Sequence, residues 1–396
     1  MRILYINPGL DFKRGGAVSA ALQLANALSG RGVEIVIFAP RGNKENVGYT
    51  EKYSRIKVEF FKKGFFSNFW TGYSLPLTRE LKQRVKEFDL IHIHEMWHYP
   101  NFAAYRMAKR AKKPFIVSVH GELTPKMLSY KALRKKVYYN FIQKKILDNA
   151  SALHAITSNE AETLSNITSN KNIFCIPNGI NAEEFNNVPN EDIFTDAFPE
   201  IEGKKVILFL GRIHPVKGLD LLARAFTEVL KKVPEALLVI AGSGSEEYKT
   251  DIVNILVSGD AIKSTIFTGM VQGSMKRAIL RRADIFVLPS HSEVLGISTL
   301  EAMISEVPVI VTKKCNFPEI EKMSAGKIVD VNVQDLTEAI IELALDPKKR
   351  LEMGKNGKKL VEETYTLSSA ANKMKKVYEK IIGKEDLGEM SLCRRV

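Results

Sequence analysis

Short apolar runs alternate with helical patterns along the whole chain. In the first half the expected strands cover Ile3–Asn7, Glu34–Phe38, Lys57–Phe61, Leu90–His94, Phe115–His120, Leu153–Ile156 and Ile173–Ile176. In the second half they cover Val206–Leu210, Leu237–Ala241, Thr265–Phe267, Ile285–Leu288, Val307–Val311 and Lys327–Val329. Most of these runs are apolar at successive positions, as strands buried on both faces of a parallel sheet must be. Helical patterns such as Val18–Leu28 and Arg134–Asp148 lie between them. The pattern predicts an α/β fold with two doubly wound parallel sheets.

A loop-like stretch separates the two halves. Asn186–Gly203 contains two prolines and several acidic residues, and a new strand pattern begins at Lys204. We therefore expect one domain over residues 1–185 and a second over 204–364, followed by a helix over 365–382 and a polar tail over 383–396. Ligands of such sheets bind at the carboxyl ends of the strands, so two of them predict an interdomain cleft that holds a ligand.

The composition is that of a soluble folded protein. Apolar residues make up 45% of the 396 residues and charged residues 26%. The three cysteines lack metal-ligand spacing, which favours a reducing compartment. No apolar run approaches the ~18 residues that span a bilayer, and the N-terminus enters a strand pattern without a leader sequence. We expect a cytoplasmic protein, and we exclude disulfide scaffolds, membrane-spanning chains and collagen-like chains.

The basic excess lies entirely in the first half. Residues 1–180 contain 28 Lys+Arg and 13 Asp+Glu, whereas the remainder contains 30 and 32. The first half therefore carries +15 and the second −2. This asymmetry favours an anionic partner, although a merely solvated basic surface would have the same composition. Binding to nucleic acid is not expected because no recognised module is present.

Two segments suit a peripheral position on the inner face of the cell membrane. Residues 126–147 combine seven Lys and Arg residues with an apolar stripe, and Phe60–Trp70 reads FFKKGFFSNFW. We expect the stripe to be the core face of a helix and the lysines to attract an anionic leaflet.

Two cations follow a predicted strand in the stretch Phe209–Gly218, FLGRIHPVKG. Arg212 offers a planar fork for phosphate oxygens and Lys217 a point charge. Their position at the carboxyl end of a strand favours a phosphate site over the alternative of two solvated loop charges.

Two carboxylates surround a predicted helix start in SHSEVLGISTLEAM, Ser290–Met303. The N–H groups of Gly296, Ile297 and Ser298 are suited to a pyrophosphate at the helix N-terminus. Glu293 in the preceding loop could contact a sugar, and Glu301 within the helix a ribose diol. The alternative for Glu301 is an acidic side chain that complements the helix dipole.

Histidines follow two other strands. His120 precedes Gly121 at the carboxyl end of a strand, which favours a functional role over a structural one. His92 and His94 alternate along another strand, and Glu95 and Trp97 follow them. A metal site at these histidines is not favoured because no third ligand is evident.

The ordered series of motifs resembles the retaining nucleotide-sugar glycosyltransferases of family 4 (group 1), and the resemblance covers nearly the whole chain. The motifs are Gly15-Gly16, VHGE at Val119–Glu122, IPNGI at Ile176–Ile180, GRIHPVKG, AGSG at Ala241–Gly244, TGMV at Thr268–Val271 and the pair Glu293 and Glu301. The resemblance implies the GT-B fold of two facing Rossmann-like domains, an acceptor-side domain and a nucleotide-sugar domain. We expect His94, Glu95 and Trp97 on the acceptor side. It also implies that the C-terminal helix returns to the first domain.

The resemblance implies a role for each matching residue. Gly16 and Gly244 approach the donor, Arg212 and Lys217 neutralise its diphosphate, and the Val271 backbone meets the base. Glu301 binds the ribose, Glu293 the transferred sugar, and His120 lies against that sugar near the reacting carbon. Two departures are notable: Val294-Leu295 replaces a small residue and an aromatic after Glu293, and Tyr365-Thr366-Leu367 lacks a common tryptophan.

The expected activity is retaining hexosyl transfer from a UDP- or GDP-linked sugar to a glycan or lipid-linked acceptor, in bacterial surface polysaccharide biosynthesis. The sequence contains no Asp-x-Asp motif, and fixed cations can stabilise a departing diphosphate. We therefore expect neither a metal nor any other cofactor. Two alternatives are a non-catalytic nucleotide-sugar-binding subunit of the same fold and a dinucleotide-dependent oxidoreductase. The oxidoreductase is disfavoured because neither Pro8–Gly16 nor Gly242–Ser245 has the expected G-x-G-x-x-G turn.

Overall fold

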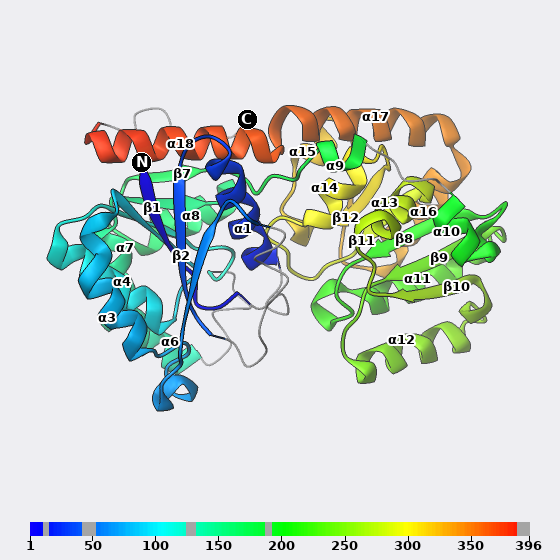
Figure 1. Cartoon of the computed structure of the whole chain (residues 1–396). Helices are drawn as coiled ribbons and strands as arrows, with labels where there is room; N and C mark the ends of the chain where they lie inside the picture. The colour runs from blue at the N-terminus through cyan, green and yellow to red at the C-terminus, as the bar shows by residue number, and fades with distance from the viewer. Residues whose placement is uncertain (11–15, 42–52, 124–131, 187–191, 386–396) are drawn as a thin grey trace. The chain divides into compact units, whose positions relative to one another are not determined.

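The computed structural model describes residues 1–10, 16–41, 53–123, 132–186 and 192–385. Contacts divide the chain into two compact units. Unit 1 comprises Met1–Gly179 and Leu367–Val396, and unit 2 comprises Ile180–Thr366. Each unit is a parallel α/β sheet with helices on its faces (Figure 1), which confirms the fold class predicted from the apolar runs.

Unit 1 contains a seven-stranded sheet with the order β3-β2-β1-β4-β5-β6-β7. Its strands are β1 Arg2–Ile6, β2 Glu34–Pro40, β3 Lys57–Phe61, β4 Leu90–His94, β5 Phe115–Ser118, β6 Ala152–Ala155 and β7 Ile173–Cys175. Its helices are α1 Gly16–Ser29, α3 Leu75–Arg84, α4 Tyr99–Ala111, α6 Ala132–Tyr138, α7 Lys144–Asn149, α8 Ser158–Ile167 and α18 Leu367–Gly383. The strand order reverses between β1 and β4, and the carboxyl edge at such a switch point is where open α/β sheets bind ligands.

Alternation along the strands supplies two separate cores in unit 1. Ile3 and Tyr5 face one side of the sheet, in a cluster with side chains of α1 and α18. Leu4 and Ile6 face the other side, in a cluster with side chains of α3 and α4. Because α18 packs against α1, the last described helix of the chain helps to cover one face of the first sheet (Figure 1).

Unit 2 repeats the scheme with six strands in the order β10-β9-β8-β11-β12-β13. The strands are β8 Lys205–Leu210, β9 Ala236–Ala241, β10 Thr265–Gly269, β11 Ile285–Leu288, β12 Val309–Thr312 and β13 Gly326–Val329. The helices are α9 Glu183–Asn186, α10 Asp192–Ala197, α11 Leu219–Leu230, α12 Glu246–Ser258, α13 Gly273–Arg282, α14 Ile297–Ile304, α15 Glu319–Lys322, α16 Val333–Leu345 and α17 Pro347–Thr364. Its switch point lies between β8 and β11. In neither unit does a described helix combine the length and the apolar character that a membrane span requires.

Two local predictions were wrong for identifiable reasons. The stretch Asn186–Gly203 is not all loop, because it contains α10, and Phe194 and Ile201 are buried in the unit 2 core. The strand predicted to reach His120 ends two residues earlier, at Ser118. His120 has a φ of 49°, in the left-handed region, which is incompatible with a continuing strand.

The predicted helix Arg134–Asp148 is interrupted by a π-helical turn, Tyr139–Gln143. The extra residue in this turn changes which side chains face the core. Gln143 is fully buried, whereas Val137 is 52% and Phe141 69% exposed. The expectation that the apolar stripe is a core face was therefore wrong at these two positions. The first part of the stripe, residues 126–131, lies outside the described residues.

Candidate active site

Arg212 and Lys217 lie in the loop that leaves β8 at the switch point of unit 2. This loop ends in a 3-10 turn over Pro215–Lys217, and Gly218 follows with a φ of 67°. A Cβ atom at Gly218 would lie 2.0 Å from the carbonyl oxygen of Pro289, in the loop that follows β11. A side chain at this position is therefore excluded, and the two loops that border the switch point pack directly on one another. Arg212 is exposed at this edge.

The loop packing brings Lys217 to Glu293. Lys217 Nζ forms an ion pair with Glu293 Oε2, and both side chains are more than four-fifths buried. The backbone N–H of Glu293 also donates to the carbonyl oxygen of Lys314 at 3.0 Å, which fixes the loop that carries the carboxylate. The predicted phosphate cation and the predicted sugar-contacting carboxylate are thus direct neighbours, although they lie on different loops.

Helix α14 begins at this same edge. Gly296 is its N-cap, so the first N–H groups of the helix, at Ile297 and Ser298, have no carbonyl partner within the helix. Glu301 lies in the middle of α14 and accepts a hydrogen bond from Lys276 Nζ of α13 at 2.6 Å. No motif in the sequence indicated Lys276, and its charge alone could not have identified it.

The two other predicted donor residues of unit 2 lie on neighbouring loops. A Cβ atom at Gly244, in the loop after β9, would lie 1.9 Å from the carbonyl oxygen of Ile213. Glycine is therefore required at this position for the loop after β9 to pack against the Arg212 loop. The carboxyl end of β9 thus lies at the same edge. Val271 lies between β10 and α13 and packs partly against the unit 2 core. In unit 1, Gly16 opens α1, while Gly15 lies outside the described residues.

The predicted histidines of unit 1 meet at the carboxyl edge of its sheet. His94 ends β4 and is 1% exposed, and its Nδ1 lies 2.9 Å from Nε2 of His120, which follows β5. The two rings stack with centroids 5.2 Å apart. Burial lowers the pKa of His120 to about 4 and that of His94 well below its ordinary value, so both imidazoles are neutral near pH 7. The acceptor-side assignment of His94 stays a prediction.

The loop after β4 has an unusual backbone. Glu95 and Trp97 have φ values of 65° and 67°, in the left-handed region that non-glycine residues seldom adopt. The Trp97 N–H donates to Oε1 of the buried Gln143 at 3.3 Å, which ties this loop to the π-helical turn. Strained backbone of this kind costs about 1–3 kcal/mol for each residue and is concentrated at functional sites.

Glu95 is part of a cluster that the sequence analysis did not identify. Nε2 of His98 lies 3.4 Å from Glu95 Oε2 and 3.8 Å from Glu122 Oε1. Burial lowers the pKa of His98, but the two carboxylates outweigh it and raise that pKa above its ordinary value. In the described part of the chain these three residues form the group that could hold a metal ion. A protonated His98 between the two carboxylates balances their negative charge in place of a metal ion. The spacing Glu95-x-x-His98 was the available sequence signal.

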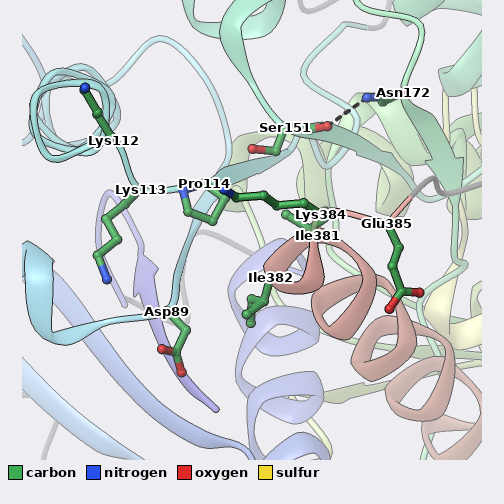
Figure 2. Close-up of a pocket in the computed structure, with 10 residues that line it drawn as sticks. All are labelled: Asp89, Lys112, Lys113, Pro114, Ser151, Asn172, Ile381, Ile382, Lys384 and Glu385. Atoms are coloured by element: carbon green, nitrogen blue, oxygen red, sulfur yellow. Dashed lines mark hydrogen bonds between the residues drawn. The ribbon is translucent and has the colours of Figure 1, made fainter.

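A pocket of about 700 Å³ opens at the amino edge of the unit 1 sheet (Figure 2). It is lined by Asp89, Lys112, Lys113, Pro114, Ser151, Asn172, Ile381, Ile382, Lys384 and Glu385. Asp89, Pro114, Ser151 and Asn172 directly precede the parallel strands β4 to β7, whereas His94 and His120 follow β4 and β5. The pocket therefore lies at the opposite edge from the predicted residues and is not the candidate site.

Comparisons with known proteins identify a family for each half of the chain. The family described as Glycosyltransferase Family 4 matches residues 14–184, and the family described as Glycosyl transferases group 1 matches residues 190–360. The phosphatidyl-myo-inositol mannosyltransferase of Mycolicibacterium smegmatis is 26% identical over 395 residues, which cover 97% of this chain and 95% of that protein. The D-inositol 3-phosphate glycosyltransferase of Kineococcus radiotolerans is 25% identical over 320 residues, 75% of this chain and 72% of that protein.

Solved structures share the fold. HepE of Anabaena, determined with UDP and glucose, superimposes with a TM-score of 0.79 at 17% identity, covering 96% of this chain and 100% of that one. The sucrose-phosphate synthase of Thermosynechococcus elongatus gives a TM-score of 0.76 at 20% identity, over 97% and 100% of the two chains. Since the family matches extend over both sheets and the fold agrees, the chain belongs to the group 1 (family 4) glycosyltransferases, GT-B enzymes that transfer a sugar from a nucleotide-sugar donor.

Proposed function

We propose that this enzyme transfers a hexosyl unit from a UDP- or GDP-linked sugar, with retention of configuration and without a metal ion. The observation that carries the proposal is the ion pair of Lys217 and Glu293, with Arg212 on the same loop as Lys217 and the N-terminus of α14 beside Glu293. A diphosphate departs as an anion while the sugar becomes cationic, so a site for this reaction needs fixed positive and negative groups within a few ångströms of each other.

Each donor contact follows from position. Arg212, Lys217 and the first N–H groups of α14 neutralise the diphosphate, and Glu301 binds the ribose hydroxyls. Glu293 faces the transferred sugar. The backbone of Val271 meets the base, and Gly16 and Gly244 allow close approach of the main chain to the donor. In unit 1, His120 contacts the transferred sugar near its reacting carbon, and Glu95 and Trp97 contact the acceptor.

The acceptor in this proposal is a glycan or a lipid-linked glycan of a bacterial surface polysaccharide. The M. smegmatis relative is named for transfer to a phosphatidylinositol, and the surface of unit 1 gives an independent reason for a lipid-proximal acceptor. Phe65, Phe66 and Phe69 are 94%, 58% and 74% exposed. With Val137 and Phe141 they form what we term the aromatic patch. Trp70 and Tyr138, whose ring centroids are 5.9 Å apart, join its two segments.

Exposed lysines accompany the aromatic patch. Lys62, Lys63, Lys136, Lys144 and Lys145 belong to the same two segments and are exposed. Aromatic side chains enter the headgroup region, and each nearby lysine adds about 1 kcal/mol of attraction to an anionic leaflet. We therefore infer a peripheral position on an anionic membrane surface. The triple variant Phe65→Ser, Phe66→Ser, Phe69→Ser should lose co-sedimentation with phosphatidylglycerol vesicles, whereas Leu351→Ser, at an exposed leucine of unit 2, should not. Equal binding by both variants would refute a role of the aromatic patch in membrane binding.

Thermal melting with a panel of UDP- and GDP-sugars tests the donor proposal, because a ligand that binds only the folded state raises the melting temperature. We expect stabilisation by one sugar family and release of the matching nucleotide diphosphate on turnover with acceptor lipids. Stabilisation without turnover would favour the alternative of a non-catalytic sugar-nucleotide-binding subunit. No stabilisation by any donor would refute the proposal.

A further inference from the structure

A continuous chain of buried hydrogen bonds runs across neighbouring strands of unit 1, on the face of the sheet that carries α18. It runs through the side chains of Tyr5, Tyr378, His92, Ser118 and His154 and ends on the carbonyl oxygen of Ile176. The successive donor–acceptor distances are 2.8, 2.6, 2.6, 2.6 and 2.8 Å. Every side chain in it is at most 2% exposed.

The carbonyl oxygen of Ile176 can only accept, and this sets the direction of the whole chain. His154 must donate its Nε2–H to that oxygen, so its Nδ1 accepts the Ser118 hydroxyl. Ser118 in turn accepts the Nε2–H of His92, and His92 Nδ1 accepts the hydroxyl of Tyr378. Both imidazoles are neutral because burial lowers the pKa of His154 to about 3 and that of His92 well below its ordinary value.

His94 lies between this chain and His120. Its ring stacks on His92 with centroids 4.2 Å apart and packs on Tyr5 at 4.5 Å. Its Nδ1 is bonded to His120 Nε2. The two remaining ring nitrogens of the pair, Nε2 of His94 and Nδ1 of His120, are buried without a hydrogen-bond partner among the described residues.

Two neutral imidazoles that share one hydrogen bond leave one unpaired N–H and one unpaired lone pair. An unpaired buried N–H is the rarer and more costly of the two. If His120 were the donor, the unpaired N–H would lie on His94, which is 1% exposed in the core. If His94 is the donor, the unpaired N–H lies on His120, in the loop at the carboxyl edge where ligands of such sheets bind. The second arrangement is the less costly one.

We propose that His94 is a positioning residue that donates Nδ1–H to His120 Nε2 and thereby holds His120 as the Nδ1–H tautomer, a hydrogen-bond donor toward an oxygen of the transferred sugar. This inference rests on the proposed function for the role of His120, but the tautomer itself does not. The stack on His92 holds His94 in place, so the buried chain supports the catalytic edge through packing.

Nitrogen NMR of protein labelled with ¹⁵N-histidine tests the tautomer directly. The chain has 7 histidines, and the absent signals of His94→Asn and His120→Asn assign the pair. For His120 we expect a protonated, pyrrole-like Nδ1 and a pyridine-like Nε2. A protonated Nε2 on His120 would overturn the proposal, whatever the enzyme's donor is.

Steady-state kinetics tests the positioning role. His94→Leu should lower kcat by about 10–100-fold, less than the full contribution of an acid–base side chain, with little change in donor KM. His94→Asn retains an N–H near the position of Nδ1 and should restore most of kcat. In a His120→Leu background, His94→Leu should cost almost nothing more, because the two residues act as a unit. An equal cost in both backgrounds would overturn the proposal. Normal turnover of His120→Leu would instead refute the catalytic assignment of His120, and the NMR result would still decide the tautomer.

Discussion

Lys276 Nζ lies 2.6 Å from Glu301 Oε1, joining α13 to α14 across the edge of unit 2. The carboxylate assigned to the ribose is thus held by a neighbouring helix and compensated in charge. A carboxylate has room for several hydrogen bonds, so Glu301 can keep Lys276 and still accept from two hydroxyl groups. Lys276 sets the direction in which the carboxylate points.

This relationship predicts the behaviour of Glu301 variants. Glu301→Gln should weaken binding of the nucleotide diphosphate and the nucleotide sugar alike, by about 10–100-fold, the equivalent of a hydrogen bond to a charged group. Lys276→Met should weaken both in the same direction by a smaller factor, because it releases the carboxylate without removing it. Calorimetric titration of both variants checks this result. Unchanged affinity in Glu301→Gln would remove the ribose assignment.

The neighbouring carboxylate should behave differently. Glu293→Gln removes the partner of Lys217 but no diphosphate contact, so affinity for the nucleotide diphosphate should stay the same or tighten slightly. Turnover should fall, because a contact to the flattening sugar is made mainly in the transition state. Titration with UDP or GDP, paired with initial rates, separates the two effects. A loss of nucleotide affinity here, with none in Glu301→Gln, would mean that the two roles are exchanged.

Arg212→Ala and Lys217→Ala should each cut turnover by roughly 10²–10³, the scale of losing one preorganised contact to developing charge. Arg212→Lys should recover only part of this loss, because a point charge cannot replace a bidentate fork. Lys232→Ala, an exposed lysine after α11, serves as the matched control. Initial rates and circular dichroism are the measurements, and near-normal turnover in both folded variants would contradict the assignment.

Transfer should continue in EDTA, because Arg212, Lys217 and the N-terminus of α14 supply the positive potential. The check is turnover before and after chelation. Loss of activity with recovery in Mg²⁺ or Mn²⁺ would contradict metal independence. Glu122→Gln, in the cluster with Glu95 and His98, would then show whether that unit 1 group holds the required metal ion.

The buried histidines predict a pH dependence of stability. The pKa of His154 is about 3 in the folded protein and about 6.5 when unfolded. The stabilisation that comes from neutral His154 is complete above pH 6.5 and is lost as the pH falls toward 3. The loss amounts to about 2 kcal/mol by pH 5. Glu160, whose pKa burial raises to about 7, acts in the opposite sense over the same range. Wild type and a His154 variant must therefore be compared to isolate the contribution of this histidine to stability.

Urea unfolding of the wild type and of His154→Phe at pH 7 and pH 5 makes this comparison. The variant should be less stable at pH 7, since Ser118 and Ile176 lose a partner. From pH 7 to pH 5, the change in its free energy of unfolding should be more positive than that of the wild type by about 2 kcal/mol. Identical changes in both proteins would show that His154 takes no part in acid destabilisation.

The sequence alone determined the two parallel sheets and the loops that carry the chemistry. Buried parallel strands must be apolar on both faces, so thirteen short runs were visible without a structure. Side chains that directly follow such strands lie at the carboxyl edge by geometry, which placed Arg212, Glu293 and His120 on that edge. None of these inferences needed a contact between distant residues.

Only the tertiary structure decided which of these residues touch. Lys217 and Glu293 are 76 residues apart, and His92 and Tyr378 are 286 apart. Pairing over such separations depends on loop packing, such as Gly218 against Pro289, and on the position of α18, neither of which leaves a periodic signal. The exposure of Phe141 depended on the π-helical turn, whose single extra residue rotates the pattern and is invisible in composition. Sequence periodicity reports burial averaged over an element, whereas an ion pair, a tautomer or an exposed ring depends on the neighbours that folding brings to it.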